Sequence, residues 1–113
     1  MRTYVAGPMR HRPMHNFPAF FKAAELLRNR GDMVVNPAER DMREGFKPGL
    51  PEEDQGFDLD EAFKWDFRML IGCDAIYLLN GWETSRGAMA ELEVAQLCGL
   101  DVQWEEGALN PNG

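Results

Sequence analysis

The residues best placed to do chemistry lie between Asn80 and Glu91, where an apolar run turns through a glycine and enters a predicted helix. Ser85 and Gly87 stand at the start of that helix, and backbone N–H groups at a helix N-terminus bind anions such as phosphate. Glu91 follows about one turn further in, where its carboxylate could act on a sugar held beside that phosphate. The stretch therefore indicates chemistry on a nucleotide. A plain helix cap at Ser85 and a solvent-facing Glu91 are the simpler explanations of the same residues.

Asp66 is a second candidate, because it interrupts an apolar stripe at helical spacing. The apolar members of that stripe are Leu59, Phe63 and Leu70. A buried acid without a partner costs several kcal/mol, so such an acid usually has a hydrogen-bonding neighbour, a raised pKa or a face on a cavity. The alternative is that the helix rolls slightly and Asp66 pairs at the rim with Lys64 or Arg68.

A local positive site follows the first predicted strand. Gly7 and Pro8 end the strand, and Met9 leads into Arg10-His11-Arg12, in a chain whose net charge is −7. That charge repels a nucleic-acid polymer, whereas a small nucleotide needs only a local cluster of cations. A solvated basic turn explains these residues equally well.

The apolar patterning predicts alternating strands and helices. Strands are expected at 3–6, 33–35, 74–79 and 102–104. The first helix is expected to run from an N-cap at Asn16 to Gly31. The second should run from a capping box at Asp58 and Glu61 to about Ile71, and the third from Arg86 to Cys98. Residues 38–57 lack periodicity and are expected to form a long loop, whose acids Asp41, Glu44 and Glu52–Asp54 are most simply solvated.

This alternation implies right-handed βαβ crossovers. We therefore expect a three-layer α/β sandwich, flavodoxin- or Rossmann-like, with a mostly parallel sheet of four to five strands. Ligands in such folds sit at the carboxyl ends of the strands. Three segments reach that edge and should meet in one crevice: 7–12, 36–37 and 80–87. Trp82, in the last of these, could stack on a base or cover the edge of the core.

Length and composition narrow the class of protein. The 113 residues are expected to form one domain, 1–113, and no apolar run approaches the roughly 20 residues that span a bilayer. No signal peptide is apparent, and Cys73 and Cys98 form no CxxC pair, which favours a reducing, cytoplasmic setting. His11 and His15 have no evident third partner, so no metal or other cofactor is expected.

At these residues the chain resembles the nucleoside 2-deoxyribosyltransferase-like superfamily, which includes the 2'-deoxynucleoside 5'-phosphate N-hydrolases and small phage-associated domains. The resemblance extends from Tyr4 to about Gly99. It is carried by Tyr4-Val5-Ala6-Gly7-Pro8, by Asp66, and by Ser85-Arg86-Gly87-Ala88-Met89-Ala90-Glu91.

The resemblance implies a role for each of these groups. Glu91 would be the nucleophile that attacks the anomeric carbon and forms a glycosyl-enzyme, Asp66 the general acid at the departing base, and Tyr4 the residue that orients Glu91. A 5'-phosphate would rest near Gly7, Pro8, Met9 and Arg10, and on Ser85 and Gly87. The chain departs from the hydrolases in carrying Pro8 where they tend to carry a serine. Its end, 110–113, does not match the tail that in relatives completes a neighbouring subunit's pocket.

Two classes of function follow. The first is an enzyme that cleaves or transfers the N-glycosidic bond of a (deoxy)nucleoside or its 5'-monophosphate. The second is a module without catalysis that senses or sequesters a nucleotide or an ADP-ribose-like signal. Hydrolysis and transfer are both open, and the base is not readable because its contacts are expected in residues 38–57. The resemblance also implies a homodimer or a higher homo-oligomer.

Overall fold

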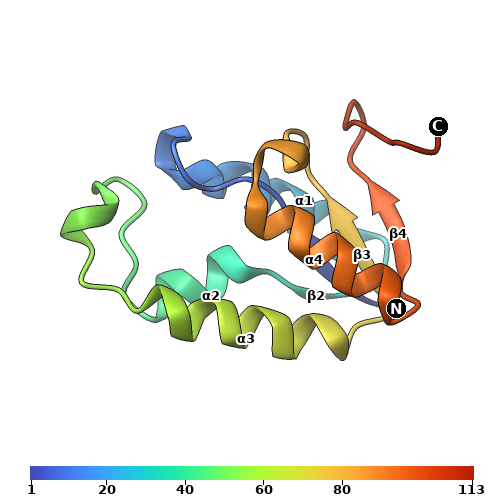
Figure 1. Ribbon diagram of the computed structural model, residues 1–113, viewed down its shortest axis with the longest axis horizontal. Coiled ribbons are helices and arrows are strands. Elements are labelled where there is room, and N and C mark those ends of the chain that lie inside the picture. The colour runs from blue at the N-terminus through green and yellow to red at the C-terminus, as the bar shows by residue number, and fades with distance from the viewer.

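The computed structural model describes all residues, 1–113. Strands and helices alternate along the chain (Figure 1). Their bounds are β1 Arg2–Ala6, α1 Phe17–Asn29, β2 Met33–Val35, α2 Pro37–Arg43, α3 Leu59–Ile71, β3 Ala75–Leu78, α4 Arg86–Leu97 and β4 Asp101–Trp104. Short 3₁₀ helices lie at Glu52–Asp54 and Trp82–Thr84. No helix combines the length and the apolar character needed to cross a membrane.

The four strands form one parallel sheet in the order β2-β1-β3-β4. All four residues of β3 are buried, as its continuous apolar run predicts for a strand covered on both faces. The predicted α/β architecture with a parallel sheet is therefore confirmed. The carboxyl ends of β1 and β3, which are neighbours in the sheet, lie at the same edge.

Helices cover both faces of the sheet. Figure 1 shows α3 and α4 together on one face, with α1 on the other. Tyr4 and Ile76 alternate with Val5 and Tyr77, so that the first pair packs toward α3 and α4 and the second pair toward α1. This alternation is what makes three layers, and it places the Tyr4 side chain under α4.

Local signals set the helix starts. Asp58 Oδ1 accepts from the Glu61 N–H at 3.1 Å, and Ser85 Oγ accepts from the Ala88 N–H at 3.1 Å, so both residues cap their helices. The predicted capping box forms only by half, because the Glu61 carboxylate pairs with Lys64. Asn16 precedes α1 as predicted, but its side chain does not cap the helix. Its amide instead donates to the Pro8 carbonyl at 2.9 Å, which ties the loop after β1 to the start of α1.

The prediction of a long loop over 38–57 is wrong for its first part, which forms α2. Asn36 Oδ1 accepts from the Ala38 N–H at 3.0 Å, and Pro37 occupies the first turn, where a missing N–H costs nothing. Ala38 and Phe46 are buried in the same cluster as α1. The helix is only seven residues long, which is too short to show a helical repeat of apolar residues in the sequence. Its packing against α1 stabilises it instead.

Candidate active site

A cavity of about 600 Å³ opens at the carboxyl edge of the sheet, between the loop after β1, α2, α3 and the start of α4. All nine residues to which the resemblance assigns a role line it: Tyr4, Gly7, Pro8, Met9, Arg10, Asp66, Ser85, Gly87 and Glu91. These residues come from segments up to 87 positions apart in the chain. The fold therefore brings the predicted set together in one place.

Glu91 and Tyr4 form the centre of the cavity wall. Glu91 is 8% exposed and lies on the buried stripe of α4, with Ala88 and Ala95 on either side. The fully buried Tyr4 hydroxyl donates to Glu91 Oε2. Burial raises the pKa of Glu91 to about 7, against the opposing effect of the Tyr4 hydrogen bond. Burial and the neighbouring Glu91 also hold the pKa of Tyr4 well above its usual value, so Tyr4 keeps its proton and donates.

Asp66 faces the same cavity from α3 and is 9% exposed. Its Oδ1 is buried without a hydrogen-bond partner, so the carboxyl is not paired at the rim, and Lys64 pairs with Glu61 instead. Burial raises its pKa to about 8, and the negative charges of Glu91 and Asp41 add to the effect. At neutral pH this carboxyl therefore holds a proton next to an ionisable Glu91.

Two glycines line the cavity, and one of them leaves room that a side chain would fill. A Cβ at Gly7 would lie 2.8 Å from Cβ of Leu79, so only glycine lets the chain pass this close to β3. A Cβ at Gly87 would make only an ordinary contact, 3.4 Å from the ring of Phe63. The close approach that requires glycine is therefore at the loop after β1.

The basic segment after β1 is only partly available to a ligand. Arg10 pairs with Glu52 at 2.5 Å across the mouth of the cavity. Arg12 donates to Thr84 Oγ1 at 3.1 Å and does not line the cavity. Arg86, which sequence reasoning did not single out, lines it at the start of α4. Arg10 and Arg86 are therefore the two arginines that line the cavity.

Sequence reasoning also missed Asp41. It was expected to be solvated, but it is 7% exposed and lines the cavity from α2. Burial raises its pKa to about 6, which the neighbouring Arg40 partly opposes. The available signal was the Asn36-Pro37 pair, a helix cap followed by a first-turn proline, which would have indicated a helix in this segment.

Trp82 does not face the ligand. It is 6% exposed, packs against Trp104 with ring centroids 5.6 Å apart, and donates from its indole N–H to the Leu109 carbonyl at 2.8 Å. Of the two roles open to it, the structure shows the one in the core. The same hydrogen bond holds the C-terminal segment against its own chain.

The two histidines do not form a metal site. His15 Nδ1 lies 2.8 Å from the carbonyl oxygen of Pro48. Both His11 and His15 line the cavity. No group of three or more His, Cys, Asp or Glu side chains is arranged to hold a metal ion.

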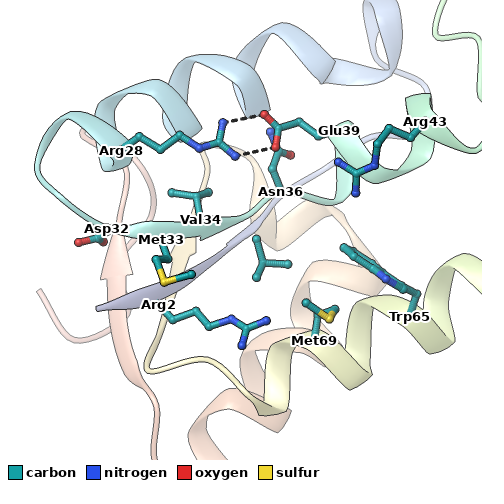
Figure 2. Close-up of a pocket in the computed structure, with 11 residues that line it drawn as sticks. Arg2, Arg28, Asp32, Met33, Val34, Asn36, Glu39, Arg43, Trp65 and Met69 are labelled. Atoms are coloured by element: carbon teal, nitrogen blue, oxygen red, sulfur yellow. Dashed lines mark hydrogen bonds and ion pairs between the residues drawn. The ribbon is translucent and has the colours of Figure 1, made fainter.

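A second cavity of about 450 Å³ lies between β2 and α3. Figure 2 shows Arg2 and Arg43 pointing into it, with Trp65 on its wall. Arg28, which also lines it, is already bound to Glu39 by two hydrogen bonds of 2.7 Å. None of the residues to which the resemblance assigns a role contributes to this cavity, but Asn36, which was expected at the ligand crevice, does.

Comparisons with known proteins bear on the fold. The chain is similar to the solved structure of a 2-deoxyribosyltransferase from the psychrotolerant bacterium Bacillus psychrosaccharolyticus, with a TM-score of 0.67 and 23% sequence identity over 92% of this chain and 71% of that one. At this identity the likeness is one of fold. No curated protein matches the chain in sequence. One family model, described as "Domain of unknown function (DUF4406)", matches residues 1–104.

Proposed function

The chain belongs to the DUF4406 family of domains of unknown function, and we propose that it cleaves or transfers the N-glycosidic bond of a (deoxy)nucleoside or its 5'-monophosphate. The observation that carries the proposal is the buried Tyr4–Glu91 hydrogen bond beside the unpartnered Asp66, all in one cavity. The fold shared with a 2-deoxyribosyltransferase supports it.

Glu91 has the properties of a nucleophile for an anomeric carbon. Tyr4 holds Oε2, which leaves Oε1 to attack. A glycosidic bond to a base breaks through an oxocarbenium-like state, and a carboxylate stabilises the charge that develops there. Because the pKa of Glu91 is raised only to about 7, the side chain is ionised in a large fraction of molecules at neutral pH.

Asp66 has the properties of the general acid. Its pKa of about 8 keeps it protonated at neutral pH, and a catalytic acid works best when its pKa lies near the working pH. Two carboxyl groups whose pKa values are separated by their surroundings are the usual arrangement for this chemistry.

The step balances with these two groups. Glu91 Oε1 forms a bond to C1', the C1'–N bond breaks with its electron pair going to the base, and Asp66 gives its proton to the base. Water or a second base then attacks C1' of the glycosyl-enzyme and releases Glu91, while Asp66 takes the proton of the incoming nucleophile. Hydrolysis and transfer differ only in that nucleophile.

The start of α4 favours a substrate with an anionic group. Arg86 lines the cavity there and Ser85 caps the helix N-terminus, whereas Arg10 would have to leave Glu52 to contact an anion. Pro8 has no N–H to offer, so the phosphate contacts would come from the side chains and from the helix start. A 5'-monophosphate meets these requirements better than an uncharged nucleoside.

The test is base release from a panel of ribo- and deoxyribonucleoside 5'-monophosphates and their nucleosides, followed by chromatography. Wild-type protein is compared with Glu91→Gln and with Glu93→Gln, an exposed residue of the same helix. Release by wild type and Glu93→Gln but not by Glu91→Gln supports the proposal, and the intact mass of a glycosylated protein that is absent in Glu91→Gln would identify the intermediate. No release from any substrate would refute it and would leave the binding module.

A further inference from the structure

A third carboxyl group, Asp41, faces the cavity without a role in the reaction proposed above. It reaches the cavity from α2, whereas Asp66 comes from α3 and Glu91 from α4. Asp41 is 7% exposed, and its Oδ1 is buried with no hydrogen-bond partner. A buried acceptor that is left unpaired costs stability, so its presence in a cavity points to a ligand that supplies the missing donor.

The contacts that Asp41 makes within the protein do not satisfy it. The nearest cation is Arg40, whose Nη1 lies 3.6 Å from Asp41 Oδ1, beyond hydrogen-bonding distance. The same guanidinium lies 3.6 Å from Glu44, and over the rings of Phe57 and Trp65 at 6.0 and 5.5 Å. Arg40 is thus shared among several neighbours, and its ion pair with Asp41 opposes the rise in the Asp41 pKa without placing a donor within hydrogen-bonding distance of Oδ1.

Asp41 and Asp66 hold opposite hydrogen-bonding capacities. Each has an unpaired buried oxygen on the same cavity, and their charges interact, since Asp41 is among the groups that raise the pKa of Asp66. With a pKa of about 8, Asp66 is protonated and donates at neutral pH, while Asp41, with a pKa of about 6, is ionised and accepts. The pair offers a ligand one donor and one acceptor.

We propose that Asp41 is a specificity residue that accepts from the exocyclic amino group of the base, so that with Asp66 it selects amino bases over keto bases. The inference rests on the proposed function, in which the base lies against Asp66. Adenine presents a ring-nitrogen acceptor beside an amino donor, the complement of Asp66 and Asp41, whereas a 6-keto purine presents two acceptors. Cytosine likewise carries an amino group where uracil carries a carbonyl oxygen.

A keto base would leave Asp41 worse than unpaired, because its carbonyl oxygen would face a carboxylate across a site with little water. Sites built to bind an N–H reject analogues that lack it, since the buried acceptor then has no partner. The preference should therefore be large, on the order of tenfold or more in affinity for each matched pair of bases.

The experiment measures binding by titration calorimetry of Glu91→Gln protein, which removes turnover, with AMP against IMP and CMP against UMP, each as ribo- and deoxyribonucleotide. The second protein adds Asp41→Asn, which has nearly the same shape but can donate from its amide. The control adds Asp60→Asn, an exposed acid on α3. We expect tighter binding of an amino base over its keto partner by about tenfold or more, retained with Asp60→Asn and reduced below about twofold, or inverted, with Asp41→Asn.

Equal or tighter binding of the keto nucleotides by the Glu91→Gln protein would overturn the inference, whether or not Asp41→Asn folds, and so would a failure to bind any of them. A preference that survives in a folded Asp41→Asn protein would also overturn it. The outcome is separable from that of the proposed function: base release without an amino preference refutes only the role of Asp41, and an amino preference without base release refutes only catalysis.

Discussion

Replacing Asp66 by asparagine is expected to stabilise the protein at pH 8 much more than at pH 5. Burial, with the charges of Glu91 and Asp41, raises the pKa of Asp66 from 3.8 to about 8. Between these values the folded protein retains a proton that the unfolded chain has lost. The stability linked to Asp66 is therefore fully present below about pH 4 and is lost as the pH rises through about 8.

The magnitude follows from the size of the shift. Each pKa unit corresponds to about 1.4 kcal/mol, so the three units between pH 5 and pH 8 correspond to a loss of up to about 4 kcal/mol in the free energy of unfolding. Asparagine at this position does not titrate and avoids that loss. Since small domains are stable by only about 5 to 15 kcal/mol, the difference is easily measured.

The assay is urea unfolding followed by tryptophan fluorescence at pH 5 and pH 8, for wild type, Asp66→Asn and Asp60→Asn. The exposed Asp60 supplies the control, because its replacement makes the same chemical change on the same helix without removing a buried group. Comparing the pH dependence of each variant with that of wild type cancels the titration of the groups that do not interact with Asp66. An equal decrease in stability from pH 5 to pH 8 in wild type and Asp66→Asn would refute the reasoning that Asp66 is buried and unpaired.

Three further predictions concern the same site. The value of kcat/KM for base release should rise as Glu91 ionises, with a pKa of about 7, and fall as Asp66 loses its proton, with a pKa of about 8; in Asp66→Asn any residual activity should lose the alkaline decrease. Tyr4→Phe removes the hydrogen bond that lowers the pKa of Glu91. In pH-dependent kinetics the acid side of the profile should therefore move to higher pH, and kcat should fall by about 10- to 100-fold. An unchanged profile would contradict this role of Tyr4. Gly7→Ala should destabilise the fold by about 1 to 3 kcal/mol in urea unfolding, because its Cβ would lie 2.8 Å from Cβ of Leu79, and an unaltered midpoint would contradict that contact.

The order of strands and helices, apart from α2, was readable from local patterns. The buried run of β3, the caps at Asp58 and Ser85 and the glycine after α1 are signals that act over a few residues. Parallel strands joined by helices leave their carboxyl ends at one edge. That topology is why residues as distant as Tyr4 and Glu91 could be expected on one cavity, and the structure places both there.

The burial of Asp41 could not be read in the same way. Its helix is seven residues long and too short to show a stripe, and its side chain is enclosed by segments distant in the sequence, among them α3 with Asp66. The ion pair of Arg10 joins residues 42 positions apart. Such pairings depend on how loops pack against one another, and no local pattern records them.

The chain itself therefore determined which chemical groups exist and which edge of the sheet they reach, because periodicity, caps and strand order are local or topological properties. The tertiary structure alone decided how each group behaves. It buried Asp66 and Asp41 without partners, joined Tyr4 to Glu91 and enclosed Trp82 in the core. The physical reason is that a pKa, a free acceptor or a covered ring depends on the surroundings of a side chain, which are assembled from distant parts of the chain.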